Sequence, residues 1–478
     1  MSIRTQDRGA AACQGGATPI QPSVPRPRAG ITAVASALPG EVLTSDRLQR
    51  EVARRGGLTL PPTLLTRATG IRTRRIAGDG VYASTLAVDA ARRALDSAGL
   101  GPLDVDLLLF ASASRDVAEP ATAHIVQAEL GTRAHALDVT NACNSFVNGI
   151  DLARSMILAG RARRPLVVTG ETPSRAVRTA PADFAEFRDG FAGYTFGDAG
   201  AAVVVEAVER GGILDVDTET HSEHWEAGGI PGGGSRHPRG DAYTYFRGDG
   251  NELRGVFEKV GTAVIDRTLH RTGMDWDGFA KVLVHQVTVP YLERFAELTG
   301  VPAGKLVVTV PELGNIASAT IGVQLDRIFG ELAPGERVLF VGLGGGISIM
   351  TMVWENALNC IRCNIAHSDG SGRPGLEWVS RTARDATEPG TVQSADGLDR
   401  QVQVLLCPGP PARPGSTTTA NPITEGALIR LEVHHLPGGE RCSPLVLTGG
   451  DDELAGGLRT ELYDPASLEP EPRHEVPR

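Results

Sequence analysis

The sequence lacks an uninterrupted apolar stretch of the length that crosses a membrane. Its first 30 residues carry four arginines among glycine, proline and glutamine, and contain no apolar core of the kind that a secretory signal requires. The longest apolar stretch, residues 338–354, is interrupted by four glycines, which favours a strand, a tight loop and a second strand. We therefore expect a cytoplasmic protein without a membrane span.

The sequence also has few cysteines and no excess of positive charge. Six cysteines spread over 478 residues do not form a disulfide framework. A formal net charge of −10 argues against a general affinity for nucleic acid or anionic membrane, because both repel an acidic surface. Cys360 and Cys363 with His367 resemble part of a metal site, but a second ligand pair with zinc-finger spacing is missing. We expect no metal.

The sequence does contain an internal repeat, in which three blocks recur in the same order. Short runs of Val, Leu and Phe alternate with helix-length amphipathic segments in both copies. This pattern predicts strands buried on both faces, and hence an α/β layered fold with mostly parallel strands. The paired blocks are 94–110 with 268–284, 137–150 with 307–323, and 165–172 with 338–346.

The repeat and the composition together predict four regions. Residues 1–28 are expected to form a flexible arm, and the two repeat copies to form halves at 29–205 and 206–358. Residues 359–478 are a Pro- and Gly-rich extension whose role and order the sequence leaves open. Strand-like pieces at 401–406 and 427–433 could form a small sheet there.

Cys143 lies where a strand-like stretch gives way to a helix, since apolar residues follow it at helical spacing up to Gly160. A sulfur at a helix N-terminus meets unpaired N–H groups and the positive end of the helix dipole. Both favour the thiolate, which is the form that attacks an acyl thioester. Taken alone, however, a cysteine in this setting is more often a small buried side chain.

Two further polar residues occupy places that suit catalysis. His285 ends a predicted strand at 281–284, where a neutral imidazole can donate a hydrogen bond or move a proton. Asn315 occupies the position in the second repeat copy that corresponds to the Cys143 neighbourhood in the first. Without the repeat, His285 reads as a structural histidine and Asn315 as a helix N-cap.

The glycine-rich segment 342–346 does not have the spacing of a dinucleotide-binding loop, and no acidic residue follows at the expected distance. A turn that brings backbone N–H groups beside a reacting oxygen fits the segment better. We therefore expect no nucleotide cofactor.

Six short motifs in sequence order resemble the ketoacyl synthase III branch of the thiolase superfamily, over about residues 31–355. The motifs are Thr69–Ala77, Asn141–Phe146, Phe196–Ala201, Val284–Gln286, Gly314–Asn315 and Gly344–Gly346. The resemblance implies a thiolase fold, duplicated as five α-β-α-β-α layers, and an acyltransferase that forms carbon–carbon bonds. It implies a catalytic triad of Cys143, His285 and Asn315, and an oxyanion hole formed by the N–H groups of Cys143 and Gly344.

Several segments are most similar to the OleA-like long-chain acyl-CoA condensing enzymes of olefin and β-lactone pathways, among them 114–122 and 170–172. In that subfamily a glutamate of the first segment removes an α-proton across the dimer interface, so the resemblance implies this role for Glu119. A carboxylate desolvated against an acyl channel would have a raised pKa and become a usable base. A solvated loop glutamate is the equal alternative.

The predicted function is thus Claisen condensation of two fatty acyl thioesters through an acyl-Cys intermediate, giving a β-ketoacyl thioester. The alternatives are decarboxylative condensation with malonyl-ACP, in fatty acid or polyketide biosynthesis, and acyl transfer to an alcohol or amine. The expected partners are acyl-CoA or acyl carrier protein and a second thiolase-fold subunit, in a homodimer or heterodimer. The family's CoA-stacking tryptophan has no match in Thr44–Gln49, so the carrier, the chain lengths and the choice of partner stay open.

Overall fold

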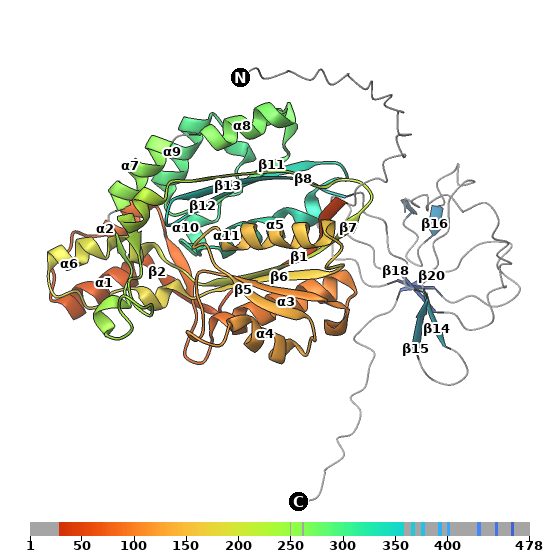
Figure 1. Ribbon diagram of the computed structural model, residues 1–478, viewed down its shortest axis with the longest axis horizontal. Coiled ribbons are helices and arrows are strands. Elements are labelled where there is room, and N and C mark those ends of the chain that lie inside the picture. The colour runs from red at the N-terminus through yellow and green to blue at the C-terminus, as the bar shows by residue number, and fades with distance from the viewer. Residues whose placement is uncertain are drawn as a thin grey trace, which may run out of the picture. The chain divides into compact units, whose positions relative to one another are not determined.

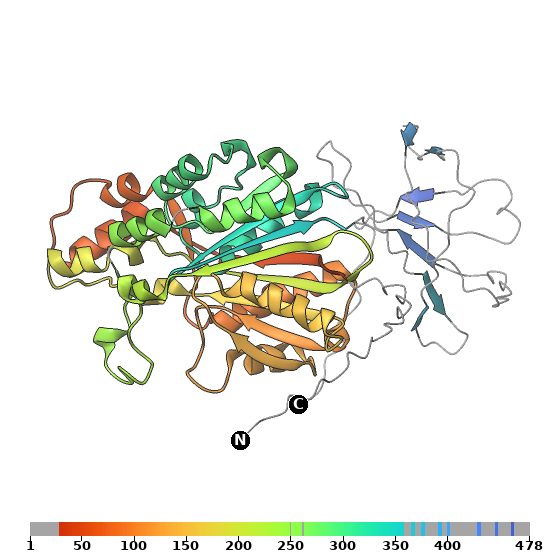
Figure 2. The same ribbon diagram turned by 45° about the horizontal axis from the view of Figure 1, so that its top comes forward.

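The computed structural model describes residues 28–248, 250–260 and 262–357, together with short strands between residues 365 and 462. Figures 1 and 2 show two sheets that lie one above the other, with helices between them and on both outer faces. The first sheet has the order β1-β7-β6-β4-β5 and the second β11-β12-β13-β8. Their strands are β1 (Arg28–Ala37), β4 (Leu107–Ala111), β5 (His135–Val139), β6 (Pro165–Glu171), β7 (Ala199–Val208), β8 (Gly212–Thr220), β11 (Lys281–Val284), β12 (Arg337–Gly344) and β13 (Ser348–Glu355).

The helices complete five layers, α-β-α-β-α, as predicted (Figure 1). One outer layer holds α3 (Ala83–Ala98) and α4 (Thr122–Leu130), and the other holds α7 (Gly250–Val260), α8 (Ala263–Thr272) and α9 (Val289–Thr299). The middle layer holds α5 (Ser145–Leu158) and α11 (Ala319–Ile328). Shorter elements are β2 (Glu41–Thr44), β3 (Thr73–Ile76), α1 (Ser45–Gly56), α2 (Leu64–Thr69), α6 (Phe184–Asp189), β9 (Gly228–Gly229), β10 (Arg247–Gly248) and α10 (Val310–Leu313).

The two sheets repeat the same strand topology, which confirms the duplication. In each sheet two antiparallel pairings are followed by a parallel one, through β1-β7-β6-β4 in the first and β8-β13-β12-β11 in the second. The fifth strand, β5, pairs in parallel with β4. In the second half a single parallel bridge between Val282 and Leu306 stands at that place. The repeat blocks found in the sequence therefore correspond to equivalent strands.

The expectation of mostly parallel strands was wrong, because both sheets are mixed. Strands β1, β7 and β6 pair in antiparallel fashion although β6 and most of β7 are buried on both faces. Burial on both faces produces the same apolar run whatever the direction of the neighbouring strand. The sequence pattern therefore reports the layer in which a strand lies, not its pairing.

Close packing of α3 on the first sheet depends on small residues on both sides. The helix buries five alanines, among them Ala87 and Ala91. On the sheet, a Cβ at Gly170 would lie 1.8 Å from the carbonyl oxygen of Ala83, and one at Gly200 would lie 2.3 Å from that of Leu86. Only glycine at these two positions lets the helix backbone approach β6 and β7 so closely.

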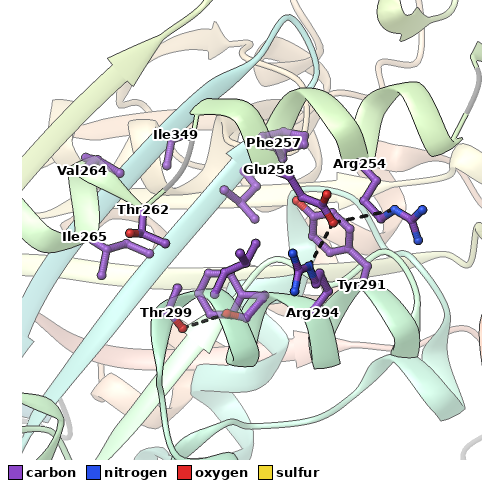
Figure 3. Close-up of a pocket in the computed structure, with 13 residues that line it drawn as sticks. Arg254, Phe257, Glu258, Thr262, Val264, Ile265, Tyr291, Arg294, Thr299 and Ile349 are labelled. Atoms are coloured by element: carbon purple, nitrogen blue, oxygen red, sulfur yellow. Dashed lines mark hydrogen bonds and ion pairs between the residues drawn. The ribbon is translucent and has the colours of Figure 1, made fainter.

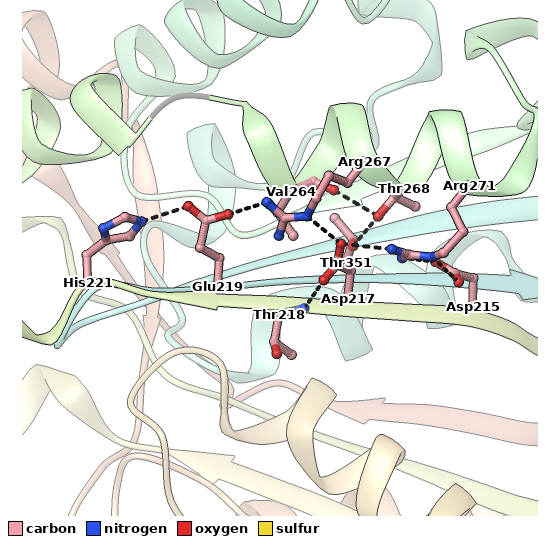
Figure 4. A network of polar contacts seen from close by, with 10 residues as sticks. All are labelled: Asp215, Asp217, Thr218, Glu219, His221, Val264, Arg267, Thr268, Arg271 and Thr351. Carbon is pink, nitrogen blue, oxygen red and sulfur yellow. Dashed lines mark hydrogen bonds and ion pairs between the residues drawn. The ribbon is translucent and has the colours of Figure 1, made fainter.

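In the first half α3 packs on its sheet through alanines, whereas in the second half α8 forms ion pairs with a strand of its sheet. Arg267 and Arg271 of α8 reach three acidic residues of β8, with distances of 2.5–3.0 Å (Figure 4). The three are Asp215, Asp217 and Glu219. This network lies along the edge strand of the second sheet, and all its arginines keep more than two fifths of their side-chain surface exposed.

The chain forms two compact units, residues Met1–Asp326 with Glu336–Ala357, and Arg327–Gly335 with Leu358–Arg478. Within the second unit the structure gives seven short strands, β14 (Ile365–Ser368), β15 (Pro374–Glu377), β16 (Thr391–Gln393), β17 (Asp399–Gln401), β18 (Leu428–Leu431), β19 (Leu445–Leu447) and β20 (Thr460–Leu462). Residues 1–27, Cys360 and Cys363 lie outside the described residues, as does the side chain of His367.

The predicted boundary between the halves at 205/206 stays a prediction, and β7 continues in the first sheet to Val208. Among the helices that the structure describes, none combines the length and apolar character that a membrane crossing requires.

Candidate active site

Cys143 lies in a tight turn between β5 and α5, two residues before the helix begins. The preceding residue, Ala142, has a φ of 48°, a left-handed conformation that L-residues rarely adopt. Ser145 closes the turn, because its hydroxyl donates to the carbonyl of Ala142 at 2.7 Å and accepts from the N–H of Asn141 at 2.8 Å. The predicted strand-to-helix position of Cys143 is thus confirmed, and the turn is built by its neighbours.

The turn between β12 and β13 lies against the sulfur. The backbone N–H groups of Cys143 and Gly345 favour the charged form of the sulfur. A Cβ at Gly345 would lie 3.6 Å from that of Ala142, and Asn144 donates from its side chain to the hydroxyl of Ser348 at 3.0 Å. Two N–H groups directed at one point are the arrangement that stabilises an oxyanion. The oxyanion hole of Cys143 and Gly344 that the resemblance implies stays a prediction, and Gly345 is the residue of this turn whose N–H group acts on the sulfur.

The resting sulfur is a thiol. Burial and the negative charge of Glu171 together raise the pKa of Cys143 to about 12, and the two backbone N–H groups only partly oppose these effects. Cys143 nevertheless keeps part of its residue surface exposed. That the helix terminus favours the thiolate stays a prediction, and in the resting site desolvation outweighs the N–H groups.

Asn315 lies in a turn of the second half that resembles the Cys143 turn. Ala317 has a φ of 45° and precedes α11, as Ala142 precedes α5. The side-chain oxygen of Asn315 accepts from the N–H of Ala317 at 3.0 Å, and its backbone forms a bridge with Phe196. Its side-chain NH2 group makes no hydrogen bond with the described residues, so this donor is left for a ligand.

His285 follows β11 and is buried, with 3% of its surface exposed. Its Nδ1 lies 3.2 Å from the hydroxyl of Thr320, which itself donates to the carbonyl of Ala317 at 2.8 Å. Burial lowers the pKa of His285 to about 4, although a hydrogen bond with the backbone of Ala317 favours its charged form. The imidazole is therefore neutral near pH 7.

A chain of contacts connects the three predicted residues. His285 and Asn315 both contact Ala317, directly or through Thr320. The next residue, Ser318, donates to the carboxylate of Glu171, whose charge acts on Cys143. That the thiol, imidazole and carboxamide share one reaction centre stays a prediction, and these contacts support it.

Glu119 lies on the loop between β4 and α4 and is exposed to solvent. It makes no hydrogen bond or ion pair with any residue that the structure describes. In the isolated chain it is thus the solvated loop glutamate of the alternative reading, and its role as a base beside a second subunit stays a prediction.

Sequence reasoning gave no role to three residues around the sulfur, Asn144, Glu171 and Gly345. Asn144 directly follows the nucleophile, and Gly345 is the middle glycine of three, so their proximity to the predicted site was the available signal. Glu171 is 28 positions from Cys143 in the sequence, and its available signal was the segment 170–172, which resembles the OleA-like enzymes. Among the residues with described side chains, no cluster of His, Cys, Asp and Glu could hold a metal.

A small apolar cavity of about 40 Å³, partly open to solvent, lies among α7, α8, α9 and the second sheet (Figure 3). Phe257, Ile265 and Phe295 line it, and Leu343 and Ile349 bracket the β12–β13 turn. At its polar rim, Glu258 pairs with Arg294 at 3.1 Å and with Arg254 at 3.9 Å. The back of the turn therefore faces an apolar cavity that is smaller than the pockets that usually hold a ligand.

Comparison with known proteins agrees with this site. The family pattern 3-Oxoacyl-[acyl-carrier-protein (ACP)] synthase III matches residues 137–222, and the pattern of its C terminal matches 269–356. Cys143 falls in the first match, and His285 and Asn315 fall in the second. The beta-ketoacyl-[acyl-carrier-protein] synthase III of Methylococcus capsulatus is 32% identical over 324 residues, which are 67% of this chain and 95% of that protein.

Solved structures of the same family share the fold. OleA of Xanthomonas campestris, crystallised with bound lauric acid and lauroyl-CoA, has a TM-score of 0.62 and 27% identity, over 69% of this chain and 99% of that one. The 3-oxoacyl-(acyl carrier protein) synthase III FabH of Xanthomonas oryzae has a TM-score of 0.62 and 28% identity, over 69% and 98%. The predicted thiolase-type fold is thus confirmed, and the chain is a member of the 3-oxoacyl-[acyl-carrier-protein] synthase III family of acyltransferases.

Proposed function

We propose that this enzyme joins two fatty acyl thioesters by Claisen condensation, without decarboxylation, and releases a β-ketoacyl thioester. The observation that carries the proposal is the packing of the Cys143 turn against the β12–β13 turn, where a Cβ at Gly345 would lie 3.6 Å from that of Ala142. There the backbone N–H groups of Cys143 and Gly345 favour the charged form of the sulfur, which supports covalent acyl transfer at this atom. OleA, whose crystals hold lauric acid and lauroyl-CoA, is a structural relative of this chain.

The first step loads the enzyme. The Cys143 sulfur attacks the carbonyl of one thioester, so that a new carbon–sulfur bond forms and the bond to the carrier breaks. The thiol proton passes by way of the neutral His285 to the departing carrier sulfur. The two N–H groups stabilise the negative oxygen of the tetrahedral intermediate.

The second step forms the carbon–carbon bond. Glu119, which in the proposed dimer comes from the second subunit, removes the α-proton of the other thioester. His285 and the free NH2 group of Asn315 donate to the enolate oxygen. The enolate carbon attacks the acyl carbon on Cys143, and the thiol is regenerated with the proton that Glu119 had taken.

Glu119 is exposed in the isolated chain, so the proposal requires a second subunit that covers this loop and removes water from the carboxylate. The proposal allows either a second copy of this chain or a related subunit as that partner. A cytoplasmic location and acyl-CoA or acyl carrier protein as the acyl source belong to the same proposal.

Decarboxylative condensation with malonyl-ACP is the second candidate. It is favoured by the 32% identity to a beta-ketoacyl-[acyl-carrier-protein] synthase III. In that reaction loss of CO2 generates the enolate, so no protein base is required, and Glu119 would be dispensable.

The two candidates separate in one experiment. The full chain is incubated with lauroyl-CoA alone, and both products and intact protein mass are recorded. We expect a lauroyl adduct on the wild type, none on Cys143→Ala, and a β-keto product without any malonyl donor. Glu119→Gln is the matched variant, and it should form the adduct but no condensation product. A product that requires malonyl-ACP and survives Glu119→Gln would reject the non-decarboxylative proposal.

A further inference from the structure

Glu171, the last residue of β6, is a carboxylate with no exposed surface. It makes no ion pair with a cation in the part of the chain that the structure describes. Four hydrogen bonds take the place of water and of a positive charge. Oε1 accepts from the N–H of Ala113 at 2.8 Å and from the hydroxyl of Ser318, and Oε2 accepts from the N–H of Ser114 at 3.0 Å and from its hydroxyl at 2.7 Å. A buried charge is tolerated only when its oxygens are satisfied in this way.

The donors come from both halves of the fold. Ala113 and Ser114 begin the loop that continues to Glu119, and Ser114 also accepts from the N–H of Thr172 at 3.0 Å. Ser318 lies between Asn315 and α11, and its hydroxyl is 2.7 Å from that of Thr169. One carboxylate therefore joins the segment that carries the proposed base to the segment that carries the carboxamide.

The same carboxylate acts on the nucleophile. It is the only ionised side chain among the groups that shift the pKa of Cys143, and it shifts it upward. A negative charge fixed beside a thiol disfavours the thiolate. The geometry thus gives Glu171 two effects, one on the position of the loops and one on the charge state of the sulfur.

We propose that Glu171 is a positioning residue that holds the Ala113–Glu119 loop and the Asn315 turn against the nucleophile. The inference deepens the proposed function, on which its catalytic part rests. The negative charge that Glu171 brings to this place would in addition leave the thiol less open to alkylation and oxidation until an acyl thioester is bound.

The first test is Glu171→Gln, which keeps the shape and removes the charge. The rate of iodoacetamide modification is followed from pH 7 to 11 by mass spectrometry of the peptide that contains Cys143. We expect the profile to shift toward lower pH, with a higher rate at pH 8, because removal of the negative charge raises the thiolate fraction. A purely structural role would leave this profile unchanged.

Glu206→Gln is the matched control. Glu206 is also a buried glutamate of the first sheet, where it accepts from Thr32 at 2.8 Å and from Arg164 at 3.1 Å, and it is not among the groups that shift the pKa of Cys143. Its substitution should leave the alkylation profile where it is. An equal shift in both variants would overturn the assigned effect of Glu171.

Ser318→Ala separates position from charge, and it keeps the idea testable if Glu171→Gln does not fold. It removes one donor and leaves the carboxylate ionised. We expect condensation to fall at least tenfold with little change in KM, as expected for a group that acts only in the transition state, while the alkylation profile moves by less than that of Glu171→Gln. Unchanged condensation in Ser318→Ala would reject the positioning role.

The alkylation experiment needs no substrate. If the wild type forms no acyl adduct, the proposed function fails, and the charge effect of Glu171 is still decided by the shift of the profile. If the adduct forms and the Glu171→Gln profile does not move, the inference about charge fails alone.

Discussion

The Cys143 turn and the Asn315 turn share a backbone and differ in chemistry. Each contains an alanine in the left-handed region, Ala142 with φ of 48° and Ala317 with φ of 45°, and each leads into a helix of the middle layer. One turn presents a thiol and the other a carboxamide. Duplication therefore supplied the same scaffold twice, and the residues placed on it diverged into a nucleophile and a hydrogen-bond donor.

The electrostatic environments of the two halves also differ in direction. In the first half, burial and Glu171 raise the pKa of Cys143 to about 12, so the thiol keeps its proton. In the second half, burial lowers the pKa of His285 to about 4, so the imidazole does not take up a second proton. Both groups are thus neutral near pH 7.

The largest expected effect tests the division of labour between the turns. Cys143→Ala should abolish both the acyl adduct and condensation. Asn315→Ala should keep the adduct and lower condensation by about 10²- to 10³-fold, the usual loss on removing one oxyanion donor. Intact mass and product formation measured on the same samples check this. Loss of the adduct in Asn315→Ala would mean that the two turns do not act in separate steps.

The sequence predicted much of this comparison, and its limits are physical. The repeat blocks identified equivalent strands because buried strands and their flanking helices leave apolar periodicity. The pairing of β1 with β7 was invisible, because apolar runs carry no direction. His285 and Asn315 gained their roles from the resemblance to a family, since an isolated histidine or asparagine has too many structural uses.

Glu171 shows what sequence patterns cannot contain. Its four donors come from residues 113, 114 and 318, which only the tertiary fold brings together. A buried carboxylate also contradicts the composition-based expectation that glutamate is exposed. The hydrogen-bond partners of a buried carboxylate depend on the tertiary structure, so the sequence alone does not predict them.

The second prediction concerns stability against pH. His285 has a lower pKa folded than unfolded, about 4 against about 6.5, so the unfolded chain binds more protons between these values. Stability is therefore present above pH 6.5 and is lost as pH falls toward 4. Between pH 7 and 5 the wild type should lose roughly 2 kcal/mol more than His285→Gln, measured by urea unfolding. An identical pH dependence in both proteins would contradict a buried neutral imidazole.

At alkaline pH, the free energy of unfolding should depend on Cys143 in the first half, and it should fall as pH rises. Cys143 has a raised pKa in the folded chain, so its contribution is present below pH 9 and is lost as pH rises through 12. Unfolding curves of the wild type and Cys143→Ala above pH 9 provide the counterpart to the histidine experiment.

The third prediction tests whether the two turns are strained alike. Valine tolerates a positive φ less well than alanine, so Ala142→Val and Ala317→Val should each lower the free energy of unfolding by about 1–2 kcal/mol. Ala142→Gly and Ala317→Gly are the matched variants, and they should cost little or stabilise, because glycine adopts this conformation freely. Urea unfolding of all four variants measures the difference. A large loss at one alanine alone would show that the turns are equivalent only in outline.

The smallest expected effect lies where the outer layers diverge. In the first half, α3 approaches the sheet through buried alanines. In the second half, α8 reaches β8 through Arg271 and its partners Asp215 and Asp217 (Figure 4). Because these side chains are partly exposed, Arg271→Ala should cost less than about 1 kcal/mol at low salt, and the cost should shrink as salt screens the pairs.

Ala91→Leu in α3 should instead cost about 1–3 kcal/mol at every salt concentration, because overpacking in a tight interface does not depend on screening. Urea unfolding at 0.05 M and 1 M NaCl compares the two substitutions directly. A loss for Arg271→Ala that is as large as that for Ala91→Leu, and equally insensitive to salt, would mean that the arginine stems hold α8 by packing. The two outer layers would then both be stabilised by packing, and the ion pairs on β8 would contribute little to the free energy of unfolding.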